Sequence, residues 1–140
     1  MVDYNQSLTP AEAIERLRRL DDEGLAWFEE PTLAHDYQGH ARIARELNTP
    51  VQCGENWWGP LDVRQAIEAQ ASDYVMVDVM KIGGVTGWLH ASSLAAAHGI
   101  PLSSHLWPEV SAQLLCATPT AHWLEYADWL GLRRGDSVTV

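Results

Sequence analysis

The stretch "TPVQCGENWWGP" (Thr49–Pro60) contains the joint at which a strand passes into a helix. Its β-rich run, Val51–Glu55, ends on a single carboxylate, Glu55, and the run Leu61–Ala69 that follows has helical character. Taken alone, an acid ahead of a helix is typically an N-terminal cap. A repeat of the same arrangement elsewhere in the chain indicates a different role.

The arrangement does repeat, because short β-rich runs alternate with longer amphipathic runs along the chain. The predicted strands are Val2–Asn5, Ala26–Glu30, Val51–Glu55, Tyr74–Met80, Pro101–His105 and Trp123–Tyr126. The predicted helices are one between Pro10 and Gly24, then Tyr37–Leu47, Leu61–Ala69, Gly87–His98 and Val110–Ala117. Thr9 and Glu12 form a capping-box pattern at the first of them. Strict alternation predicts an α/β fold, either an open doubly wound sheet or a (β/α)8 barrel.

A polar residue at or near the end of every predicted strand separates these two folds. The six residues are Asp3, Glu29, Glu55, Asp78, His105 and Glu125. In a barrel, the ends of parallel strands converge on one central point. A doubly wound sheet instead uses a glycine-rich turn after its first strand, and neither "DYNQS" nor "KIGGVTG" has the required G-x-G-x-x-G spacing. The pattern therefore favours the barrel.

Three of these residues, Asp3, Glu29 and Glu55, are hard oxygen ligands from successive strands, a set that suits Mg²⁺ better than zinc. Like charges that meet at one point repel unless a cation joins them. Glu30 competes with Glu29 in "FEEP". Because neighbouring side chains of a strand point to opposite faces, we expect only one of the two to reach the metal, and the residues alone do not choose.

The remaining polar residues suggest acid–base chemistry. If adjacent strands carry His105 and Asp78, the carboxylate fixes the tautomer of the imidazole and raises its basicity. Glu125, beside Trp123, is a candidate for a carboxylic acid that apolar surroundings keep protonated. Lys81 is an alternative base, although its position in a turn is equally typical of a structural or charge-balancing role.

Composition limits the partners. A net charge of −10 over 140 residues argues against nucleic acid and anionic membrane surfaces. Two cysteines build no disulfide framework, and the sequence shows no signal peptide or membrane-spanning run. These features predict a soluble, cytoplasmic protein that acts on a small molecule.

The segments "VDYNQS", "FEEPTLAHDYQGH", "TPVQCGENWWGP", "DVMKIGGVTGW", "GIPLSSHLWPE" and "ATPTAHWLE" together resemble the barrel domain of the enolase superfamily, in its mandelate racemase branch. The resemblance implies that Asp3, Glu29 and Glu55 bind Mg²⁺, which selects Glu29 over Glu30. It also implies that His105 is a general base oriented by Asp78, that Glu125 hydrogen-bonds the substrate carboxylate, and that Asn5 lies near the substrate.

The implied activity is Mg²⁺-dependent removal of the α-proton of a 2-hydroxy carboxylate through an enediolate, as in a racemase. Alternatives are a sugar-acid dehydratase, a Lys81-based enzyme of the muconate-lactonising and epimerase branch, and an inactive remnant or assembly module. The family's Lys-x-Lys base is not in this sequence, and "LGLRRGDSVTV" (Leu130–Val140) matches no family motif. We therefore expect a partial barrel of about six of eight strands, without the N-terminal capping domain, from a parent that forms homo-oligomers.

Overall fold

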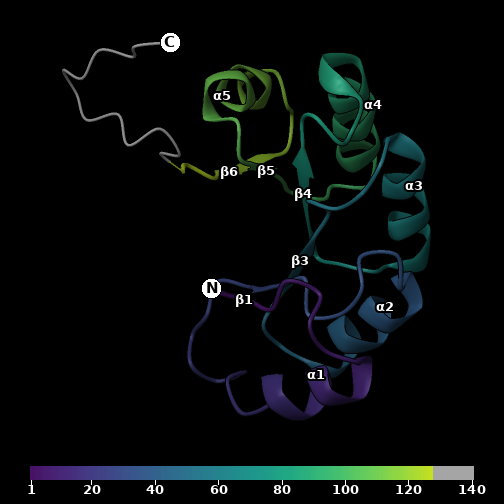
Figure 1. The fold of residues 1–140 in the computed structure, drawn as a ribbon, viewed down its shortest axis with the longest axis vertical. Helices are drawn as coiled ribbons and strands as arrows, with labels where there is room; N and C mark the ends of the chain where they lie inside the picture. The colour runs from purple at the N-terminus through teal and green to yellow at the C-terminus, as the bar shows by residue number, and fades with distance from the viewer. Residues whose placement is uncertain (128–140) are drawn as a thin grey trace, which may run out of the picture.

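The computed structural model describes residues 1–127, and in this part of the chain six strands alternate with five helices (Figure 1). The strands are β1 (Val2–Asp3), β2 (Phe28–Glu29), β3 (Val51–Cys53), β4 (Tyr74–Asp78), β5 (Leu102–His105) and β6 (Ala121–Leu124). The helices are α1 (Pro10–Leu17), α2 (Tyr37–Glu46), α3 (Pro60–Ala69), α4 (Gly84–Ala97) and α5 (Pro108–Cys116). The segment Leu130–Val140 lies outside the described residues.

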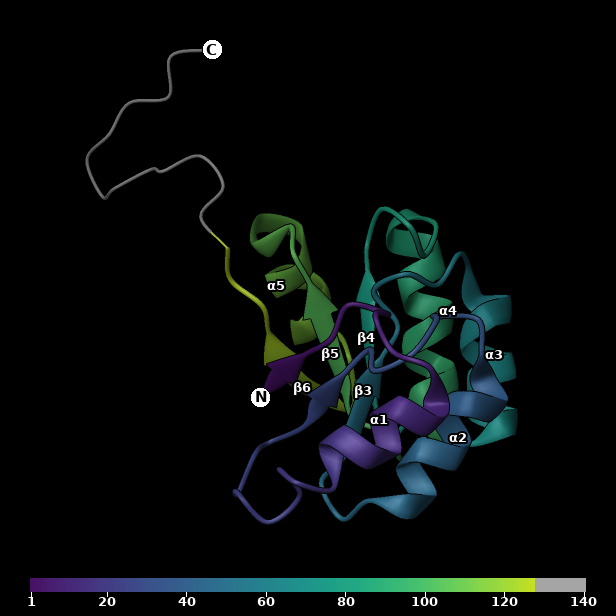
Figure 2. The same cartoon turned by 60° about the horizontal axis from the view of Figure 1, so that its bottom comes forward.

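The strands form one parallel sheet in the order β1-β2-β3-β4-β5-β6, so each strand pairs with its neighbours in the sequence. The helices lie outside this curved sheet, as Figures 1 and 2 show. A doubly wound sheet reverses its strand order at a switch point, whereas a barrel adds strands in sequence around an arc. The prediction of a partial (β/α)8 barrel is therefore confirmed.

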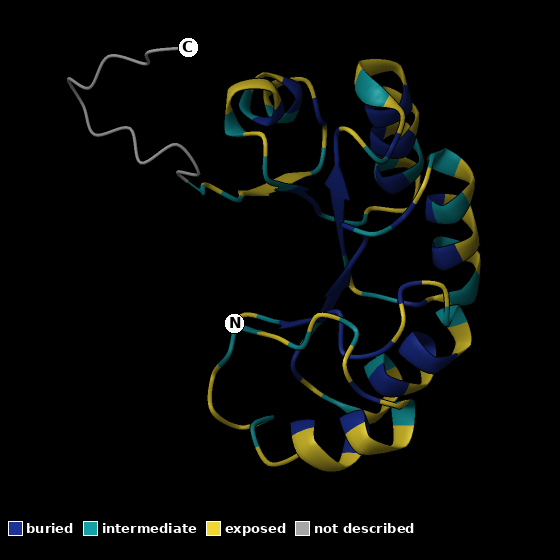
Figure 3. Cartoon of the chain, viewed as in Figure 1, coloured by how far each residue is buried: buried dark blue, intermediate teal, exposed yellow. Residues whose placement is uncertain are grey.

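The apolar core lies between the sheet and the helices. The largest fully buried apolar side chains include Leu17 of α1, Ile43 of α2 and Trp88 of α4. Figure 3 shows the buried sides of the helices facing the strands and their exposed sides facing outward. Burying one such aliphatic side chain stabilises the fold by about 1.5–3 kcal/mol, so this layer fixes the positions of the strands.

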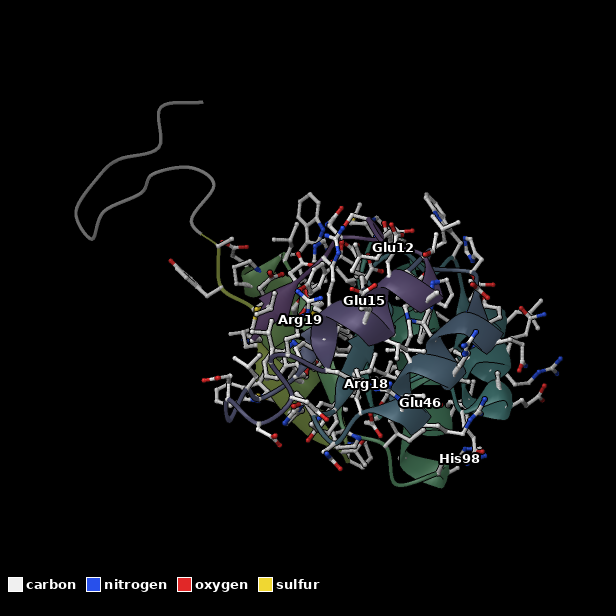
Figure 4. The ribbon with its side chains drawn as sticks, turned by 90° about the horizontal axis from the view of Figure 1, so that it is seen from below. Glu12, Glu15, Arg18, Arg19, Glu46 and His98 are labelled. Atoms are coloured by element: carbon white, nitrogen blue, oxygen red, sulfur yellow. The ribbon has the colours of Figure 1, made fainter. Side chains whose placement is uncertain are left out.

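Helix α1 begins as the sequence predicts. The Thr9 hydroxyl accepts a hydrogen bond from the backbone N–H of Glu12 at 3.3 Å, and the Glu12 carboxylate accepts one from the N–H of Thr9 at 2.9 Å. After α1, Arg18 pairs with Glu46 of α2 on the outer surface (Figure 4). Such exposed ion pairs contribute little to stability, so burial and capping hold this unit.

Several elements end earlier or begin earlier than predicted. Strand β1 stops before Asn5 and β2 stops before Glu30, because these two residues adopt left-handed backbone conformations with φ of 42° and 38°. Helix α4 begins at Gly84 rather than Gly87. A Cβ on Gly87 would lie 1.9 Å from the carbonyl oxygen of Ile82, so this glycine serves close packing within the helix.

Candidate active site and metal centre

The predicted site residues lie at the carboxyl ends of the strands. Asp3, Glu29, Asp78 and His105 are the last residues of β1, β2, β4 and β5. Glu55 follows β3 by two residues, and Glu125 comes directly after β6. Because the strands are parallel and in sequential order, these six side chains share one edge of the sheet. This is the edge at which barrel enzymes build their active sites.

His105 and Asp78 form a hydrogen-bonded pair across β4 and β5, which are in register at these two residues. The distance from His105 Nδ1 to Asp78 Oδ2 is 2.8 Å. Asp78 Oδ1 accepts hydrogen bonds from the backbone N–H groups of Met80 and Lys81, at 2.7 and 3.1 Å. Burial alone would raise the pKa of Asp78, but its hydrogen bonds outweigh that effect and the pKa is lowered. Asp78 therefore stays ionised and holds the imidazole in one orientation.

The other ring nitrogen of His105 faces acidic side chains. Its Nε2 lies 3.5 Å from Glu55 Oε2 and 3.9 Å from Glu125 Oε2. Burial would lower the pKa of His105, but the hydrogen bond with Asp78 and the charges of Glu55 and Glu125 outweigh burial, so the pKa is raised. His105 is thus a stronger base than a free histidine, and Nε2 is the nitrogen turned toward the carboxylates.

Two of the three proposed metal ligands are buried. Glu29 is 3% and Glu55 is 7% exposed, whereas Asp3 is exposed. Burial raises the pKa of Glu29 and of Glu55, and the charge of Asp3 raises both further. The three carboxylates are therefore near enough to repel one another. Protonation of these groups, or a bound cation, relieves that repulsion.

The carboxylates do not form a closed cluster. Among residues 1–127, no three His, Cys, Asp or Glu side chains are arranged so that they could hold a metal ion. Protein donors hold the acids apart: Glu29 Oε2 accepts from Trp27 Nε1 at 2.8 Å, and Asp3 Oδ1 accepts from the N–H of Asn5 at 2.7 Å. The donors are all hard oxygens with surplus buried negative charge, which fits a small divalent cation such as Mg²⁺.

Glu30 also lies near the carboxylates, because Asn56 Nδ2 donates to Glu30 Oε2 as well as to Glu55 Oε1. That only one residue of the pair reaches the metal stays a prediction. The left-handed backbone of Glu30 interrupts the alternation of side chains along the strand. Glu30 is fully buried, and its Oε1 has no hydrogen-bond partner among the described residues. Burial, followed by the charge of Glu55, raises its pKa to about 7.

Three residues that sequence reasoning did not place in the site contact its acids. Trp107 Nε1 donates to Asp78 Oδ2 at 3.2 Å, and Asn56 Nδ2 donates to Glu55 Oε1 at 3.1 Å. Gln52 Nε2 donates to Glu29 Oε2 at 3.2 Å. Of these three residues, only Gln52 could have been predicted from the sequence, because a polar side chain in a strand that is buried on both faces must find a hydrogen-bond partner.

Glu125 differs from expectation. Its side chain is 40% exposed, and its Oε2 accepts a hydrogen bond from the backbone N–H of Leu106 at 2.8 Å. The neighbouring Trp123 is itself 55% exposed and packs on Trp27 with ring centroids 6.1 Å apart. The described surroundings of Glu125 are therefore partly polar and open rather than an apolar enclosure.

Asn5 stands beside Asp3 at the end of β1, where its left-handed conformation brings its N–H onto the Asp3 carboxylate. The Asn5 residue is exposed, on the same edge as the other site residues. Lys81 lies in the turn after β4, and its ammonium donates to Asn56 Oδ1 at 2.8 Å. Its amine therefore points toward the carboxylates rather than away from the site.

The fold and this edge define a barrel-type α/β domain that gathers carboxylates and a His–Asp pair at the carboxyl ends of its strands. The family model described as "Enolase C-terminal domain-like" matches residues 1–139. The chain belongs to this family.

Relatives of known structure and activity share the domain. The chain is 39% identical over 130 residues to the L-talarate/galactarate dehydratase of Salmonella typhimurium. It superposes on an enolase from Bradyrhizobium complexed with magnesium and mandelic acid, with a TM-score of 0.90 and 51% identity over 92% of this chain. A mutant of L-talarate/galactarate dehydratase, solved with Mg and L-glucarate, gives a TM-score of 0.89 and 39% identity over 93% of this chain.

The chain spans about a third of the length of these proteins: 33% of the dehydratase sequence and 36% of the Bradyrhizobium chain. Part of each relative therefore has no counterpart in the 140 residues. Within residues 1–127, no helix is long and apolar enough to cross a lipid bilayer.

Proposed function

We propose that this domain takes part in Mg²⁺-dependent removal of the α-proton of a 2-hydroxy carboxylate, with dehydration of a sugar acid as the reaction. The observation that carries the proposal is the His105–Asp78 pair, whose free Nε2 lies 3.5 Å from Glu55 among buried carboxylates. A base beside a cation-binding group is the arrangement that proton abstraction next to a carboxylate requires.

Asp3, Glu29 and Glu55 would hold the cation, which when bound stabilises the second negative charge of the enediolate. His105 accepts the α-proton at Nε2, because Asp78 engages Nδ1 and thereby fixes the tautomer. Glu125 hydrogen-bonds the substrate carboxylate, and Asn5 contacts the substrate at the end of β1. Asp78 stabilises the imidazolium that results from proton transfer.

Dehydration is favoured over racemisation by the comparison with the L-talarate/galactarate dehydratase. In this reaction the Cα–H bond breaks first, with the proton passing to His105 and the electron pair to the enediolate. The Cβ–O bond then breaks, and the hydroxyl group leaves as water after it takes a proton from a general acid. The enol product rearranges to a 2-keto acid.

Proton exchange on an aryl 2-hydroxy acid is the second candidate, which the mandelic acid bound to the Bradyrhizobium relative supports. Racemisation needs a second base on the opposite face of Cα, and the 140 residues contain no Lys-x-Lys. With mandelate we therefore expect exchange of the α-proton of one enantiomer without net racemisation. Lys81 is disfavoured as the base because its ammonium is engaged by Asn56.

Incubation with Mg²⁺ in deuterated water tests these assignments. Galactarate, talarate and each enantiomer of mandelate are followed by NMR, with His105→Asn as the control. We expect His105-dependent formation of a 2-keto acid, or at least deuterium at Cα, with sugar diacids, and one-sided exchange with mandelate. Exchange of both mandelate enantiomers, or exchange that survives His105→Asn, would contradict the assignment of the base.

Thermal unfolding separates the enzymatic proposal from the inactive remnant or assembly module. A ligand that binds only the folded state raises the melting temperature, so Mg²⁺ should stabilise the protein. We expect the increase to shrink in Glu55→Gln and to persist in Glu68→Gln, whose carboxylate is exposed and pairs with Arg64. A melting temperature that is insensitive to Mg²⁺ would support the remnant instead.

A further inference from the structure

Lys81 is the single lysine of the 140-residue chain, and the structure engages it at both ends. Its backbone N–H donates to Asp78 Oδ1 at 3.1 Å, on the carboxylate that orients His105. Its ammonium donates to Asn56 Oδ1 at 2.8 Å, beside the proposed metal ligand Glu55. One residue therefore contacts the base-orienting half of the site and the carboxylate half.

The orientation of the Asn56 amide follows from its charged neighbours. Asn56 Nδ2 donates to Glu30 Oε2 at 2.8 Å and to Glu55 Oε1 at 3.1 Å, while Oδ1 faces Lys81. A flipped amide would turn Oδ1 onto two carboxylates and the NH₂ group onto an ammonium. Only one orientation satisfies all four groups, and the two carboxylates and the Lys81 ammonium select it together.

We propose that Lys81 is a positioning residue that acts through Asn56 to hold Glu55 ready for the cation. The inference rests on the proposed function, because it takes Glu55 as a metal ligand. With Oε1 held by Asn56, the Glu55 carboxylate keeps one rotamer, and Oε2 stays 3.5 Å from His105 Nε2. Partners that orient a metal ligand contribute about 10–100-fold to metal affinity.

A contrasting role for Lys81 is that of a cation that only balances charge. Its charge lowers the pKa of Glu55, which burial raises. If Lys81 acted through its charge alone, its removal would lower the electrostatic repulsion of an incoming Mg²⁺ and strengthen metal binding. Positioning through Asn56 predicts weaker binding. The sign of the change therefore separates the two roles.

Calorimetric titration with Mg²⁺ of the wild-type chain, Lys81→Met, Asn56→Leu and the double variant is the test. We expect each single substitution to weaken binding by about tenfold and the double variant to be no weaker than the weaker single one, because both remove the same contact. Asn48→Leu is the matched control, since Asn48 donates to Asp21 at 3.1 Å on another face. It should leave the affinity unchanged.

Tighter Mg²⁺ binding by Lys81→Met, unchanged affinity, or strictly additive losses in the double variant would overturn the inference while leaving the proposed function in place. Loss of Mg²⁺ binding by the wild-type chain would instead overturn the proposed function, and the inference with it. Melting temperatures without metal check that each variant folds, and Lys81→Arg, which keeps a donor, should recover part of the affinity.

A readout without metal keeps the contact itself testable. Because the chain has one lysine, labelling lysine with ¹³C at Cε gives one NMR resonance from this side chain. We expect that resonance to shift in Asn56→Leu and to stay in place in Asn48→Leu. A resonance that does not shift in Asn56→Leu would overturn the proposed contact. This test remains valid even if Lys81→Met fails to fold.

Discussion

His105 and the buried carboxylates near it influence one another's pKa. Burial and neighbouring charge raise the pKa of Glu29 and of Glu55. Burial would lower the pKa of His105, but the hydrogen bond with Asp78 and the charges of Glu55 and Glu125 raise it. In the metal-free protein these groups therefore hold their protons more tightly than free side chains do. A cation must displace those protons, so its affinity increases with pH.

Glu30 gives stability a pH dependence that its folded pKa predicts. Its folded pKa of about 7 lies above the ordinary value of 4.5, so between these values the folded state binds more protons than the unfolded state. The contribution of Glu30 to the free energy of unfolding of the metal-free protein then falls as pH rises from 4.5 through 7. Glu30→Gln, which keeps the shape and cannot ionise, should be more stable than the wild type at pH 8 by on the order of 3 kcal/mol.

Urea unfolding in the presence of a chelator, at pH 4.5 and at pH 8, measures this difference. The advantage of Glu30→Gln should vanish at the lower pH, where both proteins carry a neutral side chain. Glu68→Gln serves as the control because Glu68 is exposed. An advantage that is equal at both pH values would show that the carboxylate charge is not its cause.

At the scale of residues, the sequence predicted the six polar strand ends because each occupies the same place in a repeating unit. It did not predict Glu30 as part of the carboxylate group, because its left-handed conformation depends on the surrounding turn. Trp107 and Asn56 were missed for a related reason. Their contacts to Asp78 and Glu55 depend on loops whose path no periodicity encodes.

At the scale of elements, the two glycines that open and pack α4 should differ in their tolerance of a side chain. A Cβ on Gly87 would meet the backbone carbonyl of Ile82 at 1.9 Å, whereas a Cβ on Gly84 meets no heavy atom within 4 Å. Gly84 has a φ of 69°, which costs an L-residue about 1–2 kcal/mol. We expect Gly87→Ala to be the more destabilising of the two variants, with a loss of about 3 kcal/mol in the free energy of unfolding, because the backbone must move to make room for the methyl group.

Urea denaturation of the two variants tests this ranking. Equal losses of unfolding free energy for Gly87→Ala and Gly84→Ala would mean that the backbone at the start of α4 can shift at no energetic cost. The sequence pattern predicted the start of this helix at Gly87, and only packing against Ile82 shows that Gly87 lies within the helix and Gly84 at its start. The capping box at Thr9 was predicted correctly because all of its partners lie within four residues of one another.

At the scale of the whole molecule, the described sheet has two edges, because β1 pairs only with β2 and β6 pairs only with β5 among residues 1–127. Exposed strand edges promote association between chains. All four residues of β6 are exposed, and Trp123 and Leu124 keep 55% and 39% of their surface accessible. This combination favours contact between copies of the chain.

We expect the isolated chain to self-associate at about 100 μM, a concentration at which exposed edges and apolar surface promote association. Light scattering coupled to size exclusion measures the mass as a function of concentration. Trp123→Lys should lower the associated fraction, since a charge on an edge strand opposes pairing. Val85→Lys, on the exposed side of α4, is the control. A monomeric wild-type chain throughout the range would refute this expectation.

The architecture of the whole molecule was predictable because one rule applies to every unit: strand, polar end, loop, helix. The sequential strand order follows from that repetition and needs no knowledge of individual contacts. The buried contacts inside the barrel were not predictable. Ser103 Oγ of β5 donates to Gln52 Oε1 of β3 at 3.0 Å across 51 residues of sequence, a pairing that depends on the order of the strands in the sheet.

The pairing of β5 with β6 shifts register between Leu102, which faces Ala121, and Ser104, which faces Leu124. Two steps on one strand therefore match three on the other. Successive side chains of a strand point alternately to the two faces of the sheet. The extra residue in β6 therefore reverses the face that each following side chain occupies. Glu125 comes directly after this shift, and its Oε2 lies 3.9 Å from His105 Nε2. We therefore expect the length of β6 to matter more for the site than the residues it contains. A deletion of one residue there would turn Glu125 to the opposite face.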